Sequence, residues 1–448
     1  MKIHQFEDKG LSHFSYAILS ECESQIILID PARDPSPYYA YAGENGAKII
    51  GVIETHPHAD FISSHLEIHQ LTGATIYTSS LAGADYPHQA FDEGDVISFG
   101  KIKLKAFNTP GHSPDGISIV LEHQGKDKAV FTGDTLFIGD VGRPDLRENV
   151  GNMKAKREQL ARQLYQSTRH KLMKLADEVV VYPAHGSGSL CGKSLSDAHS
   201  STIGGEKVSN YALQPMSEEV FVKVLLEDQP FIPKYFEYNV ALNKQGAPDY
   251  EPSIKAVRRL EDNFKPEEGA IIVDARGQKE FKSSHLKGSI NIQNGAKFET
   301  WLGSIVSPQE AWYLVADSEK ELNELIRKAA KIGYELTLKG AFLYNKTEGK
   351  KSAFFDKGTF LDAQDKFTIV DIRNESETKE GTFFKDAITI PLPELRERAK
   401  EIPANKPIVV HCAGGYRSAA GSSILESLIG AKAEILDMSE AVNELKKS

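Results

Sequence analysis

The feature that most constrains this chain is a group of ligand-type side chains that follows an apolar run. The run covers residues 49–53, and its isoleucines and valine predict a buried strand. Directly after it come His56, His58 and Asp60, so two imidazoles and a carboxylate leave the end of one strand together. Neutral imidazole and carboxylate are ligands that suit borderline divalent metals. For this motif alone, a polar loop with two unrelated histidines is the alternative.

Three later segments repeat this arrangement, each with one ligand-type residue directly after a short apolar strand. They are Pro110-Gly111-His112-Ser113, Thr132-Gly133-Asp134-Thr135 and Tyr182-Pro183-Ala184-His185. Four such strand ends in one chain are hard to assign to chance. We therefore predict a metal site built from the ends of several strands.

The order H-x-H-x-D, G-H-S, T-G-D-T-L-F and P-A-H-G resembles that of the metallo-β-lactamase superfamily. Binuclear hydrolases of that superfamily usually follow the Asp of the first motif with a His for the second metal. Here Phe61 stands in that place, and an apolar ring cannot bind a metal. The resemblance then leaves His56, His112 and Asp134, a two-His, one-carboxylate set of the kind found in non-haem Fe(II) oxygenases. Within the superfamily this set is similar to that of the mononuclear iron persulfide dioxygenases.

The same resemblance implies roles for other polar residues around the iron. His58, Asp60 and His185 are expected to hydrogen-bond its ligands or the substrate. A glycine-rich loop over residues 139–146 carries Arg143, and the matching segment of persulfide dioxygenases lies beside the iron. An arginine there can hold an anionic substrate group. A turn with a solvated arginine is the alternative.

The three cysteines, Cys22, Cys191 and Cys412, lie far apart and form no C-x-x-C motif. This argues against a disulfide framework and fits a reducing cytosol. Cys22 is expected to be an exposed thiol in a turn. Cys191 lies six residues after His185 and therefore near the expected pocket. We do not expect it to bind iron, and both a redox-sensing thiol at the pocket rim and an inert thiol are left open.

Length and charge limit the remaining classes. A chain of 448 residues suggests two to four domains. A formal net charge of −10 disfavours nucleic acid or an anionic membrane as the main partner. No signal peptide is seen at the start of the sequence, and no run approaches the ~18 apolar residues of a membrane span. We therefore expect a cytoplasmic protein that binds neither nucleic acid nor membrane.

Apolar alternation in the first half of the chain predicts strands with flanking helices. Strands are expected over residues 13–20, 25–30, 75–78, 96–99, 102–107, 117–122 and 128–132, and helices over 38–45, 60–71 and 154–174. The helix over 60–71 is expected to end at Gly73 and to hold Asp60 near its N-terminus, facing the metal. His65 and His69 share a face of that helix, where a packing or surface role is favoured over a zinc pair. The resemblance implies an αββα sandwich.

The second half of the chain contains an internal repeat of domain size. The apolar segment over residues 270–276 ends in Asp274 and Arg276, and it recurs over residues 367–373, which end in Asp371 and Arg373. The two copies lie about a hundred residues apart, as expected for duplicated domains. A second strand and a helix follow in each copy, which indicates two α/β domains.

The second copy carries a loop, His411-Cys412-Ala413-Gly414-Gly415-Tyr416-Arg417-Ser418, that resembles the rhodanese active loop C-x-x-G-x-R-S. Backbone N–H groups between a strand and a helix form an anion nest, and the helix N-terminus adds its dipole. Together with Arg417 they favour a thiolate at Cys412 that can carry a persulfide. The spacing C-x4-R is shorter than the C-x5-R of related phosphatase loops and favours sulfur over phosphate. A buried cysteine before a glycine turn is the alternative.

The first copy has no cysteine at the matching place, where residues 315–319 read Val-Ala-Asp-Ser-Glu. A carboxylate cannot carry sulfane sulfur, so this domain is expected to be an inactive rhodanese with a packing or spacer role. The expected fold is α/β and α+β multidomain: a metallo-β-lactamase αββα sandwich over residues 1–245, an inactive rhodanese-like α/β domain over 250–345 and an active rhodanese domain over 350–448.

The whole chain is similar to fusions of a persulfide dioxygenase with a sulfurtransferase. The resemblance implies oxidation of a low-molecular-weight thiol persulfide by O2 to sulfite and thiol at one Fe(II) per chain, with Zn as the alternative metal. It also implies sulfur exchange at Cys412, aided by Arg417 and by a sulfur-binding loop of Ala413, Gly414, Gly415 and Tyr416, with sulfite or thiosulfate as partner.

Two other functions fit the sequence less well. A zinc-dependent thioester hydrolase of the glyoxalase II type needs a second metal, which Phe61 opposes. A non-catalytic persulfide sensor is opposed by the near-complete ligand set. The sequence leaves open the thiol carrier (glutathione, coenzyme A or bacillithiol), the direction of sulfur transfer and the oligomeric state, a homo-oligomer included.

Overall fold

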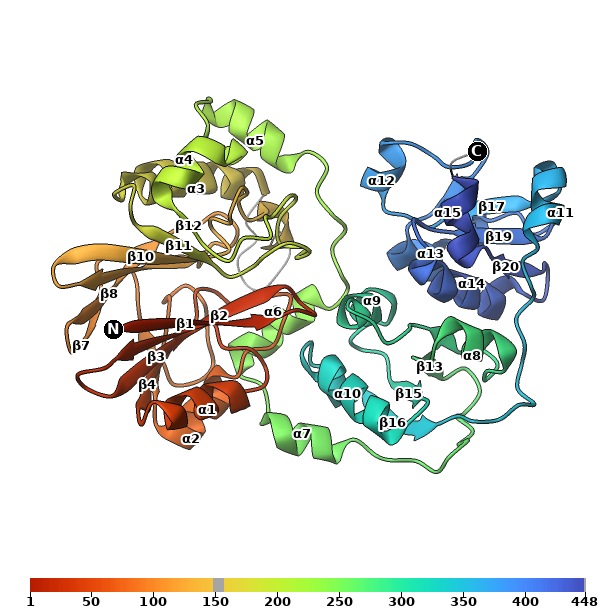
Figure 1. Cartoon of the computed structure of the whole chain (residues 1–448), viewed down its shortest axis with the longest axis horizontal. Helices are drawn as coiled ribbons and strands as arrows, with labels where there is room; N and C mark the ends of the chain where they lie inside the picture. Colours follow the sequence, from red (N-terminus) through yellow and green to blue (C-terminus); the bar gives the residue numbers. More distant parts are fainter. Residues whose placement is uncertain (148–156, 447–448) are drawn as a thin grey trace. The chain divides into compact units, whose positions relative to one another are not determined.

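The computed structural model describes residues 1–147 and 157–446, which belong to two compact units (Figure 1). The first unit holds Met1–Pro252 with Lys331–Gly333, and the second holds Ser253–Ala330 with Tyr334–Ser448. Within the described ranges no helix combines the length and the apolar character needed to cross a membrane.

The first unit is built on two six-stranded sheets, ordered β1-β2-β3-β4-β5-β6 and β12-β11-β10-β9-β8-β7. The strands are β1 (Lys2–Asp8), β2 (His13–Ser20), β3 (Gln25–Ile29), β4 (Lys48–Ile53), β5 (Thr75–Thr78), β6 (Gln89–Ala90), β7 (Val96–Phe99), β8 (Ile102–Asn108), β9 (Ile117–His123), β10 (Lys126–Gly133), β11 (Val180–Pro183) and β12 (Ser201–Thr202). The helices are α1 (Ser36–Glu44), α2 (His65–Thr72), α3 (Arg157–His170), α4 (Ile203–Ser209), α5 (Glu218–Leu226) and α6 (Phe236–Gln245).

The apolar core of this unit lies between the two sheets. Ile18 and Ile53 of the first sheet and Leu104 and Phe131 of the second belong to one buried cluster. Alternate side chains of each strand point inward, as in β8, where Leu104 is buried and its neighbour Lys103 is exposed.

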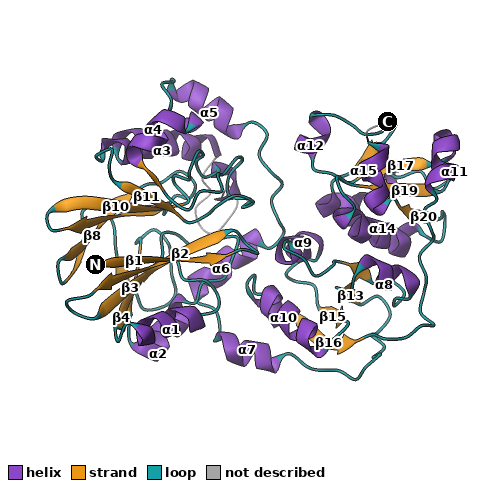
Figure 2. Ribbon diagram, in the orientation of Figure 1, coloured by secondary structure: helices purple, strands orange, loops and turns teal. Residues whose placement is uncertain are grey.

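Helices cover the outer face of each sheet (Figure 2). Buried side chains of α1 and α2 pack on the first sheet, and those of α3, α4 and α5 pack on the second. The architecture is the expected αββα sandwich, which confirms the fold class.

The second unit contains two parallel sheets of four strands each, ordered β14-β13-β15-β16 and β18-β17-β19-β20. The strands are β13 (Ile271–Asp274), β14 (Ile290–Asn291), β15 (Trp312–Ala316), β16 (Leu338–Leu343), β17 (Thr368–Asp371), β18 (Ile388–Thr389), β19 (Ile408–His411) and β20 (Ile435–Asp437). The helix α7 (Tyr250–Ala256) begins in the first unit and ends in the second. The other helices of the second unit are α8 (Gln278–Ser283), α9 (Phe298–Ile305), α10 (Glu319–Ala330), α11 (Lys357–Asp362), α12 (Glu375–Lys379), α13 (Leu395–Arg398), α14 (Tyr416–Ile429) and α15 (Val442–Leu445). The same strand order in both sheets matches the repeat in the sequence.

Two expectations about the first unit were wrong. The strand β1, Lys2–Asp8, was not predicted, because its side chains are only partly buried and its apolar alternation is weak. The helix predicted over residues 60–71 begins only at His65, although it does end at Gly73 in the left-handed conformation, as predicted. Asp60 is therefore not at a helix N-terminus.

The late start of α2 follows from tertiary hydrogen bonds. The Ser63 backbone N–H donates to Asn243, and the Ser63 hydroxyl donates to Glu54. These distant partners hold residues 60–64 out of the helix. The first residues of the helix predicted over 154–174 lie outside the described residues. Its C-terminal end differs from the prediction, because α3 ends at His170.

Candidate metal centre and sulfur-transfer loop

His56 leaves the end of β4 with its ring orientation set by a chain of hydrogen bonds. The Thr55 hydroxyl donates to Asp30 at 2.8 Å, and the His56 Nδ1 lies 3.0 Å from that hydroxyl. Because the hydroxyl proton already points to Asp30, the hydroxyl oxygen accepts from Nδ1–H. The lone pair of His56 therefore lies on Nε2, the atom that faces the centre of the site.

His112 follows β8 and is oriented in the same way from the opposite sheet. Its Nδ1 lies 2.9 Å from the backbone carbonyl of Arg143, which can only accept, so Nδ1 carries the proton and Nε2 the lone pair. The Arg143 guanidinium itself binds both carboxylate oxygens of Asp145 at 2.7 and 2.5 Å. Arg143 thus contributes to the site through its carbonyl, and its side chain is engaged with Asp145 rather than held ready for a substrate anion.

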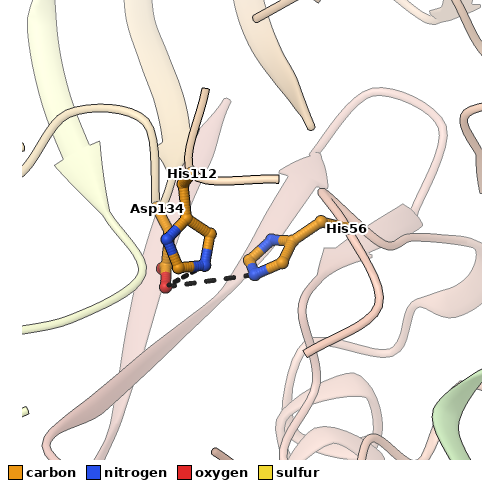
Figure 3. A group of neighbouring side chains, drawn as sticks. All are labelled: His56, His112 and Asp134. Carbon is orange, nitrogen blue, oxygen red and sulfur yellow. Dashed lines mark ion pairs between the residues drawn. The ribbon is translucent and has the colours of Figure 1, made fainter. Parts of the chain in front are cut away.

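Asp134 follows β10 and faces both imidazoles (Figure 3). Its Oδ2 lies 3.4 Å from Nε2 of His112 and 3.9 Å from Nε2 of His56. All three residues are buried, and neither oxygen of Asp134 has a hydrogen-bond partner among the described residues. Burying an uncompensated carboxylate is costly. Two imidazole lone pairs and one carboxylate that converge in this way fit a divalent cation that carries the missing positive charge.

His58 lies beside these three residues but turns toward other partners. Its Nε2 is 3.0 Å from Asp30 and 3.7 Å from Glu54, and all three side chains are buried. Although burial lowers it, the two carboxylates raise the pKa of His58 to about 9, while burial raises the pKa of Glu54 to about 8. His58 is therefore a protonated partner of Asp30. Asp30 in turn accepts from the Thr55 hydroxyl, which contacts His56.

His65 lies in the same buried region. Its Nδ1 is 3.8 Å from Glu54, and burial lowers its pKa to about 3. On the same helix face, the His69 Nδ1 is bonded to the Ala74 carbonyl. The two histidines therefore have packing and capping contacts, which agrees with the packing or surface role favoured for them over a zinc pair.

A second buried group of ligand-type residues lies beside Asp134. His185 Nε2 lies 3.3 Å from Asp60 and 3.5 Å from Oδ1 of Asp134, and Cys191 joins Asp60 and His185 with all ligand atoms within 4.8 Å of one another. Burial and the carboxylates of Asp60 and Asp134 raise the pKa of the Cys191 thiol well above its usual value. Cys191 is thus an interior thiol, which favours the inert thiol among the two alternatives left open for it.

Phe61 stands at the position where binuclear hydrolases have a histidine ligand for the second metal. Its ring packs against His13, with ring centroids 3.9 Å apart, and against His58, with centroids 4.3 Å apart. The place of a second-site histidine is therefore filled by an apolar ring that packs on two buried imidazoles.

Cys412 follows β19 directly and precedes α14 in the second unit. The Gly415 N–H donates to the Cys412 sulfur at 3.2 Å, and Gly415 has a φ of +100°, which favours glycine. The Arg417 guanidinium binds both oxygens of Glu377 at 2.5 and 2.7 Å. The structure therefore brings Cys412, the loop from Ala413 to Tyr416 and Arg417 together, with Glu377 as an additional neighbour. Cys22, in contrast, is exposed.

The loop also contacts the preceding rhodanese-like domain within the same unit. The Tyr416 hydroxyl donates to the backbone carbonyl of Gln293 at 2.7 Å, and the Arg417 guanidinium lies 5.8 Å from the centre of the Trp301 ring. Sequence reasoning missed these neighbours, together with Asp30, Thr55, Glu54 and Glu377. A signal existed only for Glu377, since Asp-x-Arg-x-x-x-Glu is present in both copies, as Asp274 to Glu280 and as Asp371 to Glu377.

Comparisons with known proteins agree with this division of the chain. The family profile described as Metallo-beta-lactamase superfamily matches residues 10–185, and the profile described as Rhodanese-like domain matches residues 256–342 and 357–447. Persulfide dioxygenase ETHE1, mitochondrial, of Homo sapiens is 31% identical over 217 residues, which are 47% of this chain and 75% of that protein. Hydroxyacylglutathione hydrolase cytoplasmic of Arabidopsis thaliana is 33% identical over 176 residues, which are 39% of this chain and 63% of that protein.

Among solved structures, the crystal structure of a metallo-beta-lactamase from Staphylococcus aureus subsp. aureus COL matches with a TM-score of 0.68 at 31% identity. The match covers 76% of this chain and 98% of that chain, so it extends beyond the first unit. The chain therefore belongs to the metallo-β-lactamase superfamily, has the persulfide dioxygenases among its relatives, and carries two rhodanese-like domains after its metallo-β-lactamase domain.

Proposed function

We propose that this protein oxidises low-molecular-weight thiol persulfides with O2 to sulfite and thiol, at one Fe(II) per chain held by His56, His112 and Asp134. The observation that carries the proposal is the convergence of two imidazoles and one carboxylate while His58 is turned away to Asp30. A set of three such ligands leaves coordination positions open for substrate and O2, as in non-haem Fe(II) oxygenases.

An Fe(II) ion bound there supplies the redox chemistry that lets O2 react with a closed-shell persulfide. The overall change is balanced: a persulfide anion, O2 and one water give sulfite, the free thiol and one proton. The chain's own residues orient the ligands, through Thr55 and the Arg143 carbonyl, and exclude bulk water by burial. The pair of Asp60 and His185, beside Asp134, can accept and hold the released proton.

We further propose that Cys412 exchanges sulfane sulfur with thiosulfate or a persulfide. The thiolate attacks the outer sulfur of thiosulfate, the sulfur–sulfur bond breaks, and sulfite leaves, so that Cys412 carries the persulfide. The Gly415 N–H and Arg417 stabilise the negative sulfur. Run in reverse, the same step converts sulfite from the first unit into thiosulfate.

The first rhodanese-like domain has no cysteine at the matching position, and we propose that it is inactive in sulfur transfer. The domain limits of 1–245, 250–345 and 350–448 stay a prediction. The contact of Gln293 with Tyr416 adds a positioning role to the spacer role expected for this domain.

A zinc-dependent thioester hydrolase is the second candidate. The observation that favours it is the group of Asp60, His185 and Cys191, which lies beside Asp134 and could hold a second metal. The similarity to hydroxyacylglutathione hydrolase points the same way. Phe61 opposes it, because the second metal loses an imidazole ligand.

Metal analysis combined with turnover separates the two functions. The full chain, made with iron and zinc both supplied, is expected to bind one iron and to consume O2 with a persulfide of glutathione, coenzyme A or bacillithiol. It is not expected to hydrolyse a glutathione thioester. Two tightly held zinc ions per chain, together with thioester hydrolysis and no O2 consumption, would instead establish the hydrolase.

A further inference from the structure

Arg417, the cation of the sulfur-transfer loop, is already bound to a carboxylate. Its two terminal nitrogens donate to the two oxygens of Glu377 at 2.5 and 2.7 Å, in a bidentate pair. The two side chains are only 13% and 30% exposed, so solvent screens the pair incompletely. Although burial opposes it, Arg417 lowers the pKa of Glu377, which is therefore ionised at neutral pH.

The same guanidinium also faces the nucleophile. Although burial acts against it, hydrogen bonds to Glu377 and Cys412 raise the pKa of Arg417. Arg417 therefore interacts with both the sulfur of Cys412 and the carboxylate of Glu377. A donor that approaches Cys412 meets the positive guanidinium together with the carboxylate bound to it.

Two other cations lie near the loop, and one of them, Arg373, also acts to lower the pKa of Glu377. Lys446 donates to the Ala413 carbonyl, and Arg373 donates to both carboxylate oxygens of Asp371. Arg417 is thus the cation that interacts with the sulfur, and its bidentate partner is Glu377. A full neighbouring cation attracts a dianion more than a cation paired with a carboxylate does.

We propose that Glu377 is a specificity-determining residue of the sulfur-transfer site, which weakens binding of the dianion thiosulfate relative to a thiol persulfide. The inference rests on the proposed role of Cys412. With thiosulfate, the group that leaves is the dianion sulfite. With a protonated persulfide, the Cys412 thiolate attacks the outer sulfur, the sulfur–sulfur bond breaks, and the thiol leaves with the proton of that persulfide. Only the first donor places two negative charges beside Glu377.

The test substitution is Glu377→Gln in the full chain. Glutamine keeps the shape of the side chain and can still accept from the Asn374 N–H, so the capping box of α12 is preserved. The matched control is Glu375→Gln, which removes the same charge from an exposed position on the same helix. Steady-state sulfur transfer is measured for both variants with thiosulfate and with glutathione persulfide as donor.

Glu377→Gln is expected to lower the KM for thiosulfate several-fold and to change the KM for the persulfide much less, while Glu375→Gln matches wild type with both donors. An unchanged KM for thiosulfate would overturn the proposal. A rise of KM with both donors would also overturn it, because Glu377 would then serve only to position Arg417.

Two further measurements keep the outcome unambiguous. If Glu377→Gln does not fold, judged by circular dichroism, Glu377→Asp keeps the charge and is expected to retain the wild-type ratio of the two KM values; a ratio shifted toward thiosulfate would contradict the proposal. Intact mass after incubation of wild type with either donor shows whether Cys412 gains one sulfur atom. No gain with either donor refutes the role of Cys412 itself, whereas a gain without a KM difference in Glu377→Gln refutes only the role of Glu377.

Discussion

At the scale of single residues, the candidate metal centre depends on which nitrogen of each imidazole carries the lone pair that faces Asp134. Thr55 and the Arg143 carbonyl take the Nδ1 protons of His56 and His112, so both Nε2 atoms face Asp134. Asp134 brings the only carboxylate of this set and hence the charge that a divalent cation needs. His58 does not face Asp134 itself; it contacts Asp30, which holds the Thr55 hydroxyl that orients His56.

These two positions should respond differently to alanine. Asp134→Ala is expected to lose iron and with it O2 consumption, because two imidazoles alone hold Fe(II) weakly. His58→Ala is expected to keep some iron, with affinity lowered about 10–100-fold, as for residues that support a ligand. Iron content by atomic emission and O2 uptake are measured on both, with thermal unfolding as control, since loss of a buried charge partner costs about 3–5 kcal/mol. Wild-type iron in Asp134→Ala, or none in a folded His58→Ala, would mean that the ligands are misassigned.

At the scale of elements, each ligand is placed by a strand end and the loop that follows it. Gly133 ends β10 with a φ of +50°, and a Cβ there would lie 2.6 Å from the Thr55 hydroxyl that orients His56. Gly142 lies in the loop after Asp134, where a Cβ would overlap the Asp134 carbonyl oxygen and come within 2.9 Å of the His112 Cβ. The two sheets thus meet at the site with no space for a methyl group.

Gly142→Ala is therefore expected to displace Asp134 and His112 and to lower iron content and O2 consumption together. Gly43→Ala in α1, where nothing lies within 4 Å of the added Cβ, is the control and should behave as wild type. Iron per chain and Tm are compared for the three proteins. If Gly142→Ala binds iron as wild type does, the close approach of the loop is not needed to hold the ligands.

At the scale of the whole molecule, the two proposed chemistries belong to different compact units. The ligands of the candidate metal centre lie in the first unit and Cys412 in the second. Each site is completed by residues of its own unit, His56 by Thr55 and Arg417 by Glu377. The two activities should therefore be separable by substitution.

Cys412→Ser tests this separation. A serine hydroxyl keeps the loop's shape but is not ionised at neutral pH, so thiosulfate sulfurtransferase activity is expected to vanish while O2 consumption with free persulfide continues. Sulfite should then accumulate where wild type forms some thiosulfate. Ion chromatography of sulfite and thiosulfate, run with O2 uptake, measures all three. Intact thiosulfate transfer would refute the role of Cys412, and an equal loss of both activities would show that the two sites work only together.

The sequence by itself determined the features that depend on near neighbours. Apolar runs that end in His56, His112, Asp134 and His185 predicted strands with ligands at their ends, because strand periodicity is local. The repeat of Asp274 and Arg276 as Asp371 and Arg373 could be recognised from the sequence because it is a local pattern. The same holds for the loop at Cys412.

Only the tertiary structure decided how buried polar groups are paired. It turned His58 to Asp30, held Ser63 to Asn243 instead of starting a helix at Asp60, placed Cys191 in the interior and bound Arg417 to Glu377. The partners in these contacts lie between 28 and 180 residues apart along the chain, except for Cys191, whose burial depends on the whole fold. A buried polar group must find a partner wherever the fold brings one, and no local pattern specifies which distant residue that is.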